Sequence, residues 1–188
     1  MNIPNSLTLL RIILIPVFIL FFYIPVGWNY TAACFIFILA AITDILDGYL
    51  ARKLGQTSTL GAFLDPVADK LMVAVVLVLL VQQNPSVWLA LPAAVIIGRE
   101  ITVSALREWM AELGARSKVA VSIVGKIKTI TQMVALGFLI FRNPFFGIPI
   151  FEIGLCLLYF AVVLTLLSMF QYILAAWPKL RDTGIQNK

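Results

Sequence analysis

The chain has 188 residues, of which 62% are hydrophobic and 12% are charged, and its net charge is +5. A soluble domain of this size usually has about a quarter charged residues and too little interior to bury so many apolar side chains. The composition therefore excludes an ordinary soluble protein and predicts a single all-α membrane domain over residues 1–188. Because the chain has no histidine, any acid–base or metal chemistry must use carboxylates, lysine, tyrosine, hydroxyl groups or water.

The N-terminal stretch MNIPNSLTLLR forms a short amphipathic segment ahead of the first long apolar run. Pro4 suits the first turn of a helix, so we predict a short helix that lies on the membrane surface. Asn5, Thr8 and Arg11 follow one another at three-residue spacing and therefore share one face of this helix. That face either closes over a bound nucleotide or points to water, with Arg11 extending to the lipid headgroups.

Six apolar runs follow, each close to the length of about 20 residues that a helix needs to cross the hydrocarbon core. They cover approximately residues 9–27, 31–51, 66–83, 86–106, 120–141 and 150–175. No small-residue cleavage site follows the first run, so we expect it to remain as a membrane helix. The sequence therefore predicts a polytopic membrane protein with six transmembrane helices.

Lysine and arginine are distributed unevenly among the segments that join these runs. Most of them lie in the N-terminal segment, in the two long loops and in the tail, whereas the three short turns carry only Arg142. Positive residues favour the cytoplasmic side, so we expect both termini and both long loops to lie there. The net positive charge is then a basic surface that faces anionic headgroups, and it does not indicate nucleic-acid binding.

Four aspartates stand where the second run ends and the third begins, within TDILDGYLARKLGQTSTLGAFLDPVADK. Asp44 and Asp47 are three residues apart, so they project from one face of a helix. Asp65 and Asp69 are four residues apart and do the same on the next helix. A hairpin between the two helices would bring the pairs together. Pro66 suits a first helical turn, which would leave Asp65 near the N-cap.

Neighbouring carboxylates need positive charge beside them, because each raises the pKa of the others. Arg52 and Lys70 supply two charges, which is too few for four aspartates. Solvation or helix capping would explain any one of these aspartates, but not two facing pairs. Two hard divalent cations, Mg²⁺ or Mn²⁺, fit the cluster better, because shared carboxylates hold two such ions in phosphoryl displacement.

Residues 44–69 read D-x2-D-G-x2-A-R-x8-G-x3-D-x3-D, a pattern that resembles the signature of the CDP-alcohol phosphotransferase family. The resemblance covers essentially the whole chain. It implies that Asp44, Asp47 and Asp65 bind two metal ions, and that Asp69 is the general base and also contacts metal. It also implies a homodimer. The residues expected to contact the CDP-linked lipid are Asn5, Thr8, Gly48, Ala51, Arg52, Ser58 and Gly61.

Three further stretches, PNSLTLLR, GREITVSALREWMAELG and GKIKTITQM, resemble the bacterial branch of this family that makes phosphatidylglycerophosphate. That resemblance implies an enzyme of the inner (cytoplasmic) membrane, with its active site on the cytoplasmic side, that uses CDP-diacylglycerol and sn-glycerol 3-phosphate. A phosphorylated acceptor needs fixed cations, which Arg107, Lys126 and Lys128 are expected to supply. The two lysines also suit a role as positive-inside anchors. Arg99 and Glu100 are expected to form a structural pair or to support other charges.

Two alternatives stay open from the sequence. An enzyme with another acceptor, such as inositol phosphate, serine or inositol, would use the same aspartates, but an uncharged acceptor would not need the basic residues. A small divalent-cation transporter would also place carboxylates between helices, but near the bilayer midplane and at a broken helix. The aspartates of this chain lie at one membrane boundary beside Arg52, which would repel a cation.

Overall fold

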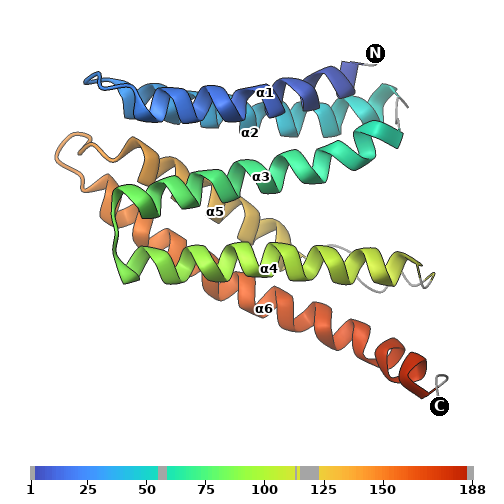
Figure 1. Ribbon diagram of the computed structural model, residues 1–188. Coiled ribbons are helices and arrows are strands. Elements are labelled where there is room, and N and C mark those ends of the chain that lie inside the picture. The colour runs from blue at the N-terminus through green and yellow to red at the C-terminus, as the bar shows by residue number, and fades with distance from the viewer. Residues whose placement is uncertain (1–2, 55–58, 113, 115–122, 186–188) are drawn as a thin grey trace.

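The computed structural model describes residues 3–54, 59–112, 114 and 123–185. These residues form six helices, which confirms the all-α prediction: α1 (Ile3–Tyr23), α2 (Asn29–Leu54), α3 (Thr59–Gln83), α4 (Val87–Glu112), α5 (Ile123–Phe141) and α6 (Ile150–Ile185). Successive helices run in opposite directions, so both termini lie at one end of the bundle, here called the terminal end (Figure 1). The turns that follow α1, α3 and α5 lie at the opposite end, here called the turn end.

Four of the helices are long and apolar enough to cross a membrane, counted over the described residues. Their apolar segments are Asn5–Tyr23, Asn29–Leu50, Val87–Glu112 and Ile150–Trp177. The chain is therefore a multi-pass membrane protein, but the prediction of six spans is confirmed only for these four helices. Charged side chains interrupt the apolar sequence of the other two. α3 carries Asp65, Asp69 and Lys70, and α5 carries Lys126 and Lys128 in its first two turns.

The prediction of a separate surface helix at the N-terminus is wrong. α1 continues without a break from Ile3 to Tyr23, so the amphipathic segment forms the first turns of the first span. Pro4 lies in the first turn, as predicted, and no further proline or glycine follows it before Pro16. Because nothing in between favours a bend, the polar face of this segment enters the bundle with the rest of α1.

The predicted start of the third helix is also wrong. α3 begins at Thr59 rather than at Pro66, so Pro66 lies inside the helix and Asp65 is not at an N-cap. A proline inside a helix removes one backbone hydrogen bond, and here the helix tolerates that loss. The consequence for the site is that Asp65 and Asp69 both lie within one continuous helix.

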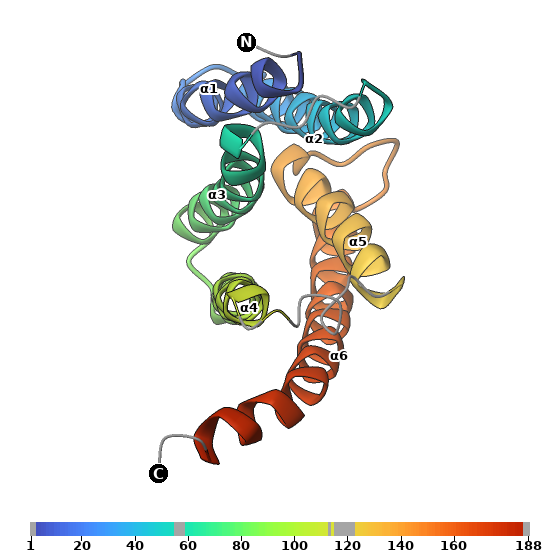
Figure 2. The same ribbon diagram turned by 90° about the vertical axis from the view of Figure 1, so that its right-hand side faces the viewer.

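The core of the bundle is apolar and receives side chains from all six helices. Its most buried members include Phe18, Phe37, Leu77, Ile96 and Leu136. α1 and α2 lie side by side, and α3, α4, α5 and α6 complete the bundle below them in the view of Figure 2. A second apolar cluster joins α4 to α6; its buried members are Val103, Met110, Tyr172 and Ala176.

Large apolar side chains cover much of the outside of the bundle. Phe35, Ile45 and Trp88 are each about 70% exposed, at 68%, 69% and 70%. In water such a surface would be strongly unfavourable, whereas lipid chains solvate it well. The outer surface therefore agrees with the membrane location that the apolar helices indicate.

Gly154 of α6 lies where this helix comes close to α5. A Cβ atom at this position would lie 2.9 Å from Cβ of Phe138 and 3.1 Å from the backbone nitrogen of Leu139. We expect Gly154→Ala to lower the Tm of the purified protein by roughly 3–10 °C, because overpacking costs about 1–3 kcal/mol. Gly98→Ala is the matched control, since a Cβ atom there meets nothing within 4 Å. Equal Tm values for the two variants would contradict close packing at Gly154.

Candidate active site

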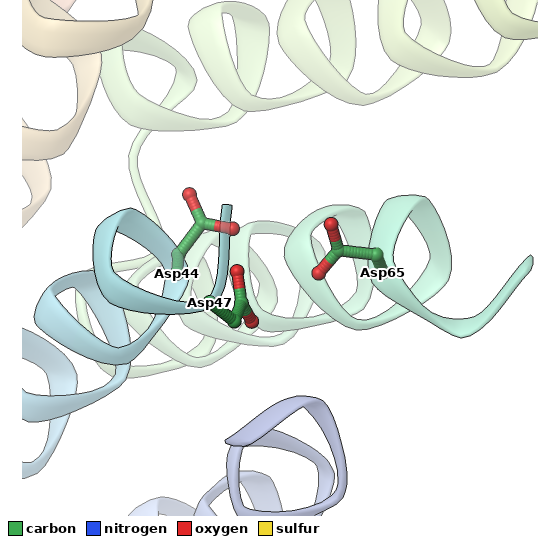
Figure 3. A group of neighbouring side chains, drawn as sticks. All are labelled: Asp44, Asp47 and Asp65. Carbon is green, nitrogen blue, oxygen red and sulfur yellow. The ribbon is translucent and has the colours of Figure 1, made fainter. Parts of the chain in front are cut away.

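Three carboxylates from two helices meet at the terminal end of the bundle. Asp44 and Asp47 lie on α2 and Asp65 lies on α3, and Figure 3 shows their carboxyl groups turned toward one another. One oxygen from each lies within 4.8 Å of the other two. The structure thus confirms for three of the four aspartates that the second and third helices bring them together, whereas Asp69 is not in this group. We call Asp44, Asp47 and Asp65 the aspartate cluster.

The guanidinium group of Arg11 reaches all three of these carboxylates from α1. Its Nη1 lies 2.7 Å from Oδ1 of Asp44 and 3.4 Å from Oδ1 of Asp65. Its Nη2 forms an ion pair with Oδ2 of Asp47. Arg11 and Asp47 are buried, with 2% and 3% of their side chains exposed, whereas Asp44 and Asp65 are 43% and 42% exposed. The aspartate cluster is therefore closed on the side of α1 and open on the side of Asp44 and Asp65.

The donor atoms of the aspartate cluster fit a hard divalent cation. Three carboxylates against one guanidinium leave a negative charge, and Mg²⁺ and Mn²⁺ prefer oxygen ligands. Oδ1 of Asp47 is buried and has no hydrogen-bond partner among the described residues, so a buried acceptor remains available. Divalent cations would supply the positive charge that this cluster lacks.

Asp69 follows Asp65 by about one helical turn on α3 and lines a cavity of about 250 Å³. The walls of this cavity come from α3, α4, α5 and α6, and they include the cationic side chains of Lys70, Arg99, Arg107 and Lys128. Phosphate groups bind well where such cations gather. We call this space the basic cavity.

Asp69 connects the basic cavity to the aspartate cluster without belonging to that cluster. It interacts electrostatically with Asp44 and Arg11 on one side, and with Glu100 and Lys128 on the other. Its carboxylate therefore lies between the aspartate cluster and the basic cavity, which is a suitable place for accepting a proton from a molecule bound in the cavity.

Glu100 of α4 holds two cations of the basic cavity in place. Nζ of Lys128 on α5 forms an ion pair with Oε1 of Glu100, and Nη1 of Arg99 lies 3.2 Å from the same oxygen. Nη2 of Arg99 donates a hydrogen bond of 2.8 Å to Oγ of Ser168 on α6, and the guanidinium carbon lies over the ring of Tyr172, 5.7 Å from its centroid. The prediction that Arg99 and Glu100 form a structural pair or support other charges is confirmed, because they pair with each other and Glu100 also pairs with Lys128.

Comparison with known proteins agrees with this arrangement. Residues 1–171 match the CDP-alcohol phosphatidyltransferase family. The chain belongs to this family. It is 58% identical over 185 residues to the CDP-diacylglycerol–glycerol-3-phosphate 3-phosphatidyltransferase of Pseudomonas fluorescens, over 98% of this chain and 94% of the relative. Proteins of the same name from Escherichia coli (strain K12) and Shigella flexneri serotype 5b (strain 8401) are each 55% identical over 181 residues, 96% of this chain and 98% of the relative.

The remaining residues of the CDP-alcohol phosphatidyltransferase signature lie around the aspartate cluster or outside the described residues. Gly48 follows Asp47 on α2 and Gly61 precedes Asp65 by about one turn on α3, and both glycines are half-buried. Ala51 and Arg52 lie in α2, but their side chains are outside the described residues, as is the whole of Ser58. On α1, Thr8 is buried and Asn5 is half-buried. A role for these residues in donor binding stays a prediction.

The three cations predicted to bind the acceptor do not lie together. Arg107 and Lys128 line the basic cavity with Asp69, whereas Lys126 is exposed and is not among the lining residues. Residues two positions apart on a helix point about 200° away from each other, so Lys126 and Lys128 of α5 cannot both face the same cavity. Lys128 is buried and paired, which also makes it more than a positive-inside anchor.

Arg11 is the site residue that the sequence did not reveal as a partner of the aspartates. Its place on one face with Asn5 and Thr8 predicted contact with a nucleotide or with headgroups, but its ion pairs lie inside the bundle. A signal was present, because an arginine that shares a helix face with two other polar residues in an apolar span tends to be buried against a partner.

An apolar groove of about 560 Å³ extends along α2 as far as the segment that carries the aspartate cluster. On α2 it is lined by Ile45, the neighbour of Asp44 in the sequence, and then by Ile42 and Ile38. On α5 its lining continues through Met133 to Phe141, near the turn end. The groove thus runs between α2 and α5 from the segment around Ile45 toward the turn end of the bundle.

Proposed function

We propose that the chain transfers the phosphatidyl group of CDP-diacylglycerol to sn-glycerol 3-phosphate, giving phosphatidylglycerophosphate and CMP. Membership of the family and the names of the relatives support this reaction. The structural observation that carries it is the position of Asp69 between two sites of opposite charge. The aspartate cluster suits a metal-bound diphosphate, and the basic cavity suits a phosphorylated alcohol.

In this proposal Asp44, Asp47 and Asp65 hold two Mg²⁺ or Mn²⁺ ions, and Asp69 is a further ligand. When bound, the ions neutralise the donor's diphosphate and make its phosphorus more electrophilic. The small residues Gly48, Ala51 and Gly61 leave space for the CDP group beside the carboxylates. Arg52 and Ser58 bind its polar atoms, and the polar face of α1 at Asn5 and Thr8 borders the same space.

The residues of the basic cavity position the acceptor and remove its proton. Arg107 and Lys128 bind the phosphate of sn-glycerol 3-phosphate, which directs the free primary hydroxyl group toward Asp69. Asp69 accepts the hydroxyl proton while the hydroxyl oxygen forms a bond to the β-phosphorus that bears diacylglycerol. The bond from that phosphorus to the bridging oxygen breaks, and the electron pair leaves with CMP. Catalysis then consists of positioning and electrostatic stabilisation.

We also propose that α3 and α5 cross the membrane, giving six spans, and that the terminal end faces the cytoplasm. The distribution of lysine and arginine supports this orientation. A site at that end is reached by water-soluble sn-glycerol 3-phosphate and releases CMP to the same side. The bacterial relatives support a location in the inner membrane. Assembly as a homodimer remains a prediction.

The apolar groove beside the aspartate cluster gives an acyl chain of the donor a place to lie. It starts at Ile45, next to a carboxylate that would hold metal, and it continues along α2 and α5. A lipid bound there keeps its hydrocarbon against apolar side chains while its diphosphate reaches the aspartates. This geometry favours a membrane-lipid donor over a water-soluble one.

CMP release by the purified protein in detergent tests the reaction. CDP-diacylglycerol and Mg²⁺ would be supplied with glycerol 3-phosphate, inositol phosphate, serine or no acceptor, each with and without EDTA. We expect release only with glycerol 3-phosphate, and no release in EDTA. Release with a different acceptor would keep the role of the aspartate cluster but overturn that of the basic cavity. No release with any acceptor, from protein that unfolds cooperatively, would favour the transporter alternative.

A further inference from the structure

Arg11 combines deep burial with contacts to every member of the aspartate cluster. Two nitrogens of one guanidinium reach three carboxylates on two helices. Its Nε is buried and has no hydrogen-bond partner among the described residues, so the carboxylates hold this side chain. A buried arginine in an apolar span is unfavourable unless it is paired, and such residues usually serve a function.

We propose that Arg11 is the cation that holds the aspartate cluster together before metal binds, and that it competes with metal for these carboxylates. The inference rests on the proposed function, because metal binding to the cluster is part of that function. Arg11 would then be a positioning residue: it keeps three ligands of the metal site assembled in a protein that has not yet bound metal.

The packing of the helices explains why this cation comes from α1. Both α2 and α3 pack against α1, so a side chain of α1 reaches the carboxylates of both. Asp47 depends most on Arg11, because it is almost fully buried and its other oxygen has no hydrogen-bond partner among the described residues. Without a cation, three carboxylates this close together would repel one another.

The open side of the aspartate cluster indicates which contacts a metal ion would replace. Nη1 of Arg11 bridges Asp44 and Asp65, the two carboxylates that are more than 40% exposed. A divalent cation that enters from this side meets the oxygens that Nη1 contacts, and it repels the guanidinium charge. Arg11 therefore stabilises the three carboxylates before metal binds, and the metal ion stabilises them afterwards. Binding of the metal weakens the ion pairs of Arg11, and the ion pairs of Arg11 weaken metal binding.

Thermal unfolding of the full chain in detergent, in EDTA and in Mn²⁺, tests this role. We expect Arg11→Met to lower Tm in EDTA by about 10 °C, the size of effect expected when one partner of a buried ion pair is removed. Mn²⁺ should restore most of that loss. The affinity for Mn²⁺, measured from free Mn²⁺ by electron paramagnetic resonance, should rise by about tenfold because a like charge has been removed. Lys53→Met, which removes an exposed cation of α2 from over the ring of Tyr49, is the control and should change neither value.

A double variant keeps the test decisive if Arg11→Met is too unstable to purify in EDTA. Asp47→Asn alone should lower Tm in EDTA, because Arg11 loses its buried partner. In the Arg11→Met background the same change should raise Tm, because it removes a buried charge that has no cation. The same Asp47→Asn effect in both backgrounds would overturn the proposal.

Two further outcomes would also overturn it. An equal loss of Tm for Arg11→Met in EDTA and in Mn²⁺ would show that Arg11 only packs. A lower Mn²⁺ affinity in Arg11→Met would show that Arg11 arranges the ligands of the bound ion instead of competing with it. Failure of the proposed reaction would appear separately. Wild-type protein would then release no CMP, while Arg11→Met would still have the lower Tm expected in EDTA.

Discussion

Asp69→Asn is expected to slow CMP release by about 10²–10⁴-fold, which is the usual contribution of a positioned general base. Asparagine has almost the same shape as aspartate, but its amide cannot accept the proton of the acceptor hydroxyl group. The packing of α3 should therefore stay intact while the chemical step slows. Because Asp69 is not one of the three clustered carboxylates, we expect most of the affinity for Mn²⁺ to remain.

Rate and metal binding must be measured on the same preparation of Asp69→Asn. Glu108→Gln is the matched control, because it makes the same acid-to-amide change at an exposed position of α4. A variant that keeps most of its activity would show that Asp69 is not the base. A parallel loss of Mn²⁺ affinity and rate would show that Asp69 acts chiefly as a metal ligand.

Lys128→Met is expected to raise the KM for glycerol 3-phosphate by about 10–100-fold, the range that corresponds to loss of one hydrogen bond to a charged group. Lys128 lines the basic cavity, and Glu100 holds its ammonium group there. An ammonium group has three donors, so donors remain for a phosphate when one is engaged by Glu100. Arg107→Met should act in the same direction, and we expect it to leave folding intact because Arg107 is exposed.

Lys126→Met provides the comparison that separates a local contact from general attraction. It removes the same charge two residues away, on an exposed part of α5 that does not line the cavity. We expect its KM to stay within about twofold of wild type at physiological salt, where exposed charges are largely screened. Equal KM values for the Lys126 and Lys128 variants would overturn the assignment of the basic cavity to the acceptor. Tm values for both variants show whether loss of the Glu100 pair disturbs folding.

The sequence predicted the aspartate cluster well because its signal is local. The spacing of Asp44 and Asp47 places both on one helix face whatever the rest of the fold, and the next helix has to return past them. The helix starts were predicted less well, because proline is compatible with a first turn and also with the interior of a helix that is stabilised by packing. Pro66 takes the second course, and α3 begins at Thr59.

The partners of the cations could not be read from the sequence for a different reason. Arg11 pairs with residues 33, 36 and 54 positions further along the chain, and only the packing of α1 against α2 and α3 decides that contact. The choice between Lys126 and Lys128 likewise needs the orientation of α5. Helix periodicity shows that the two lysines point apart, but it does not show which of them faces inward.

The continuity of α3 through Pro66 fixes the distance between the two halves of the site. Asp65 belongs to the aspartate cluster and Asp69 to the basic cavity, and four residues of helix separate them by about 6 Å along the axis. The helix thus sets the separation between the bound donor and the bound acceptor. One residue inserted between the two aspartates would turn Asp69 by about 100° away from the cavity without altering any side chain of the site.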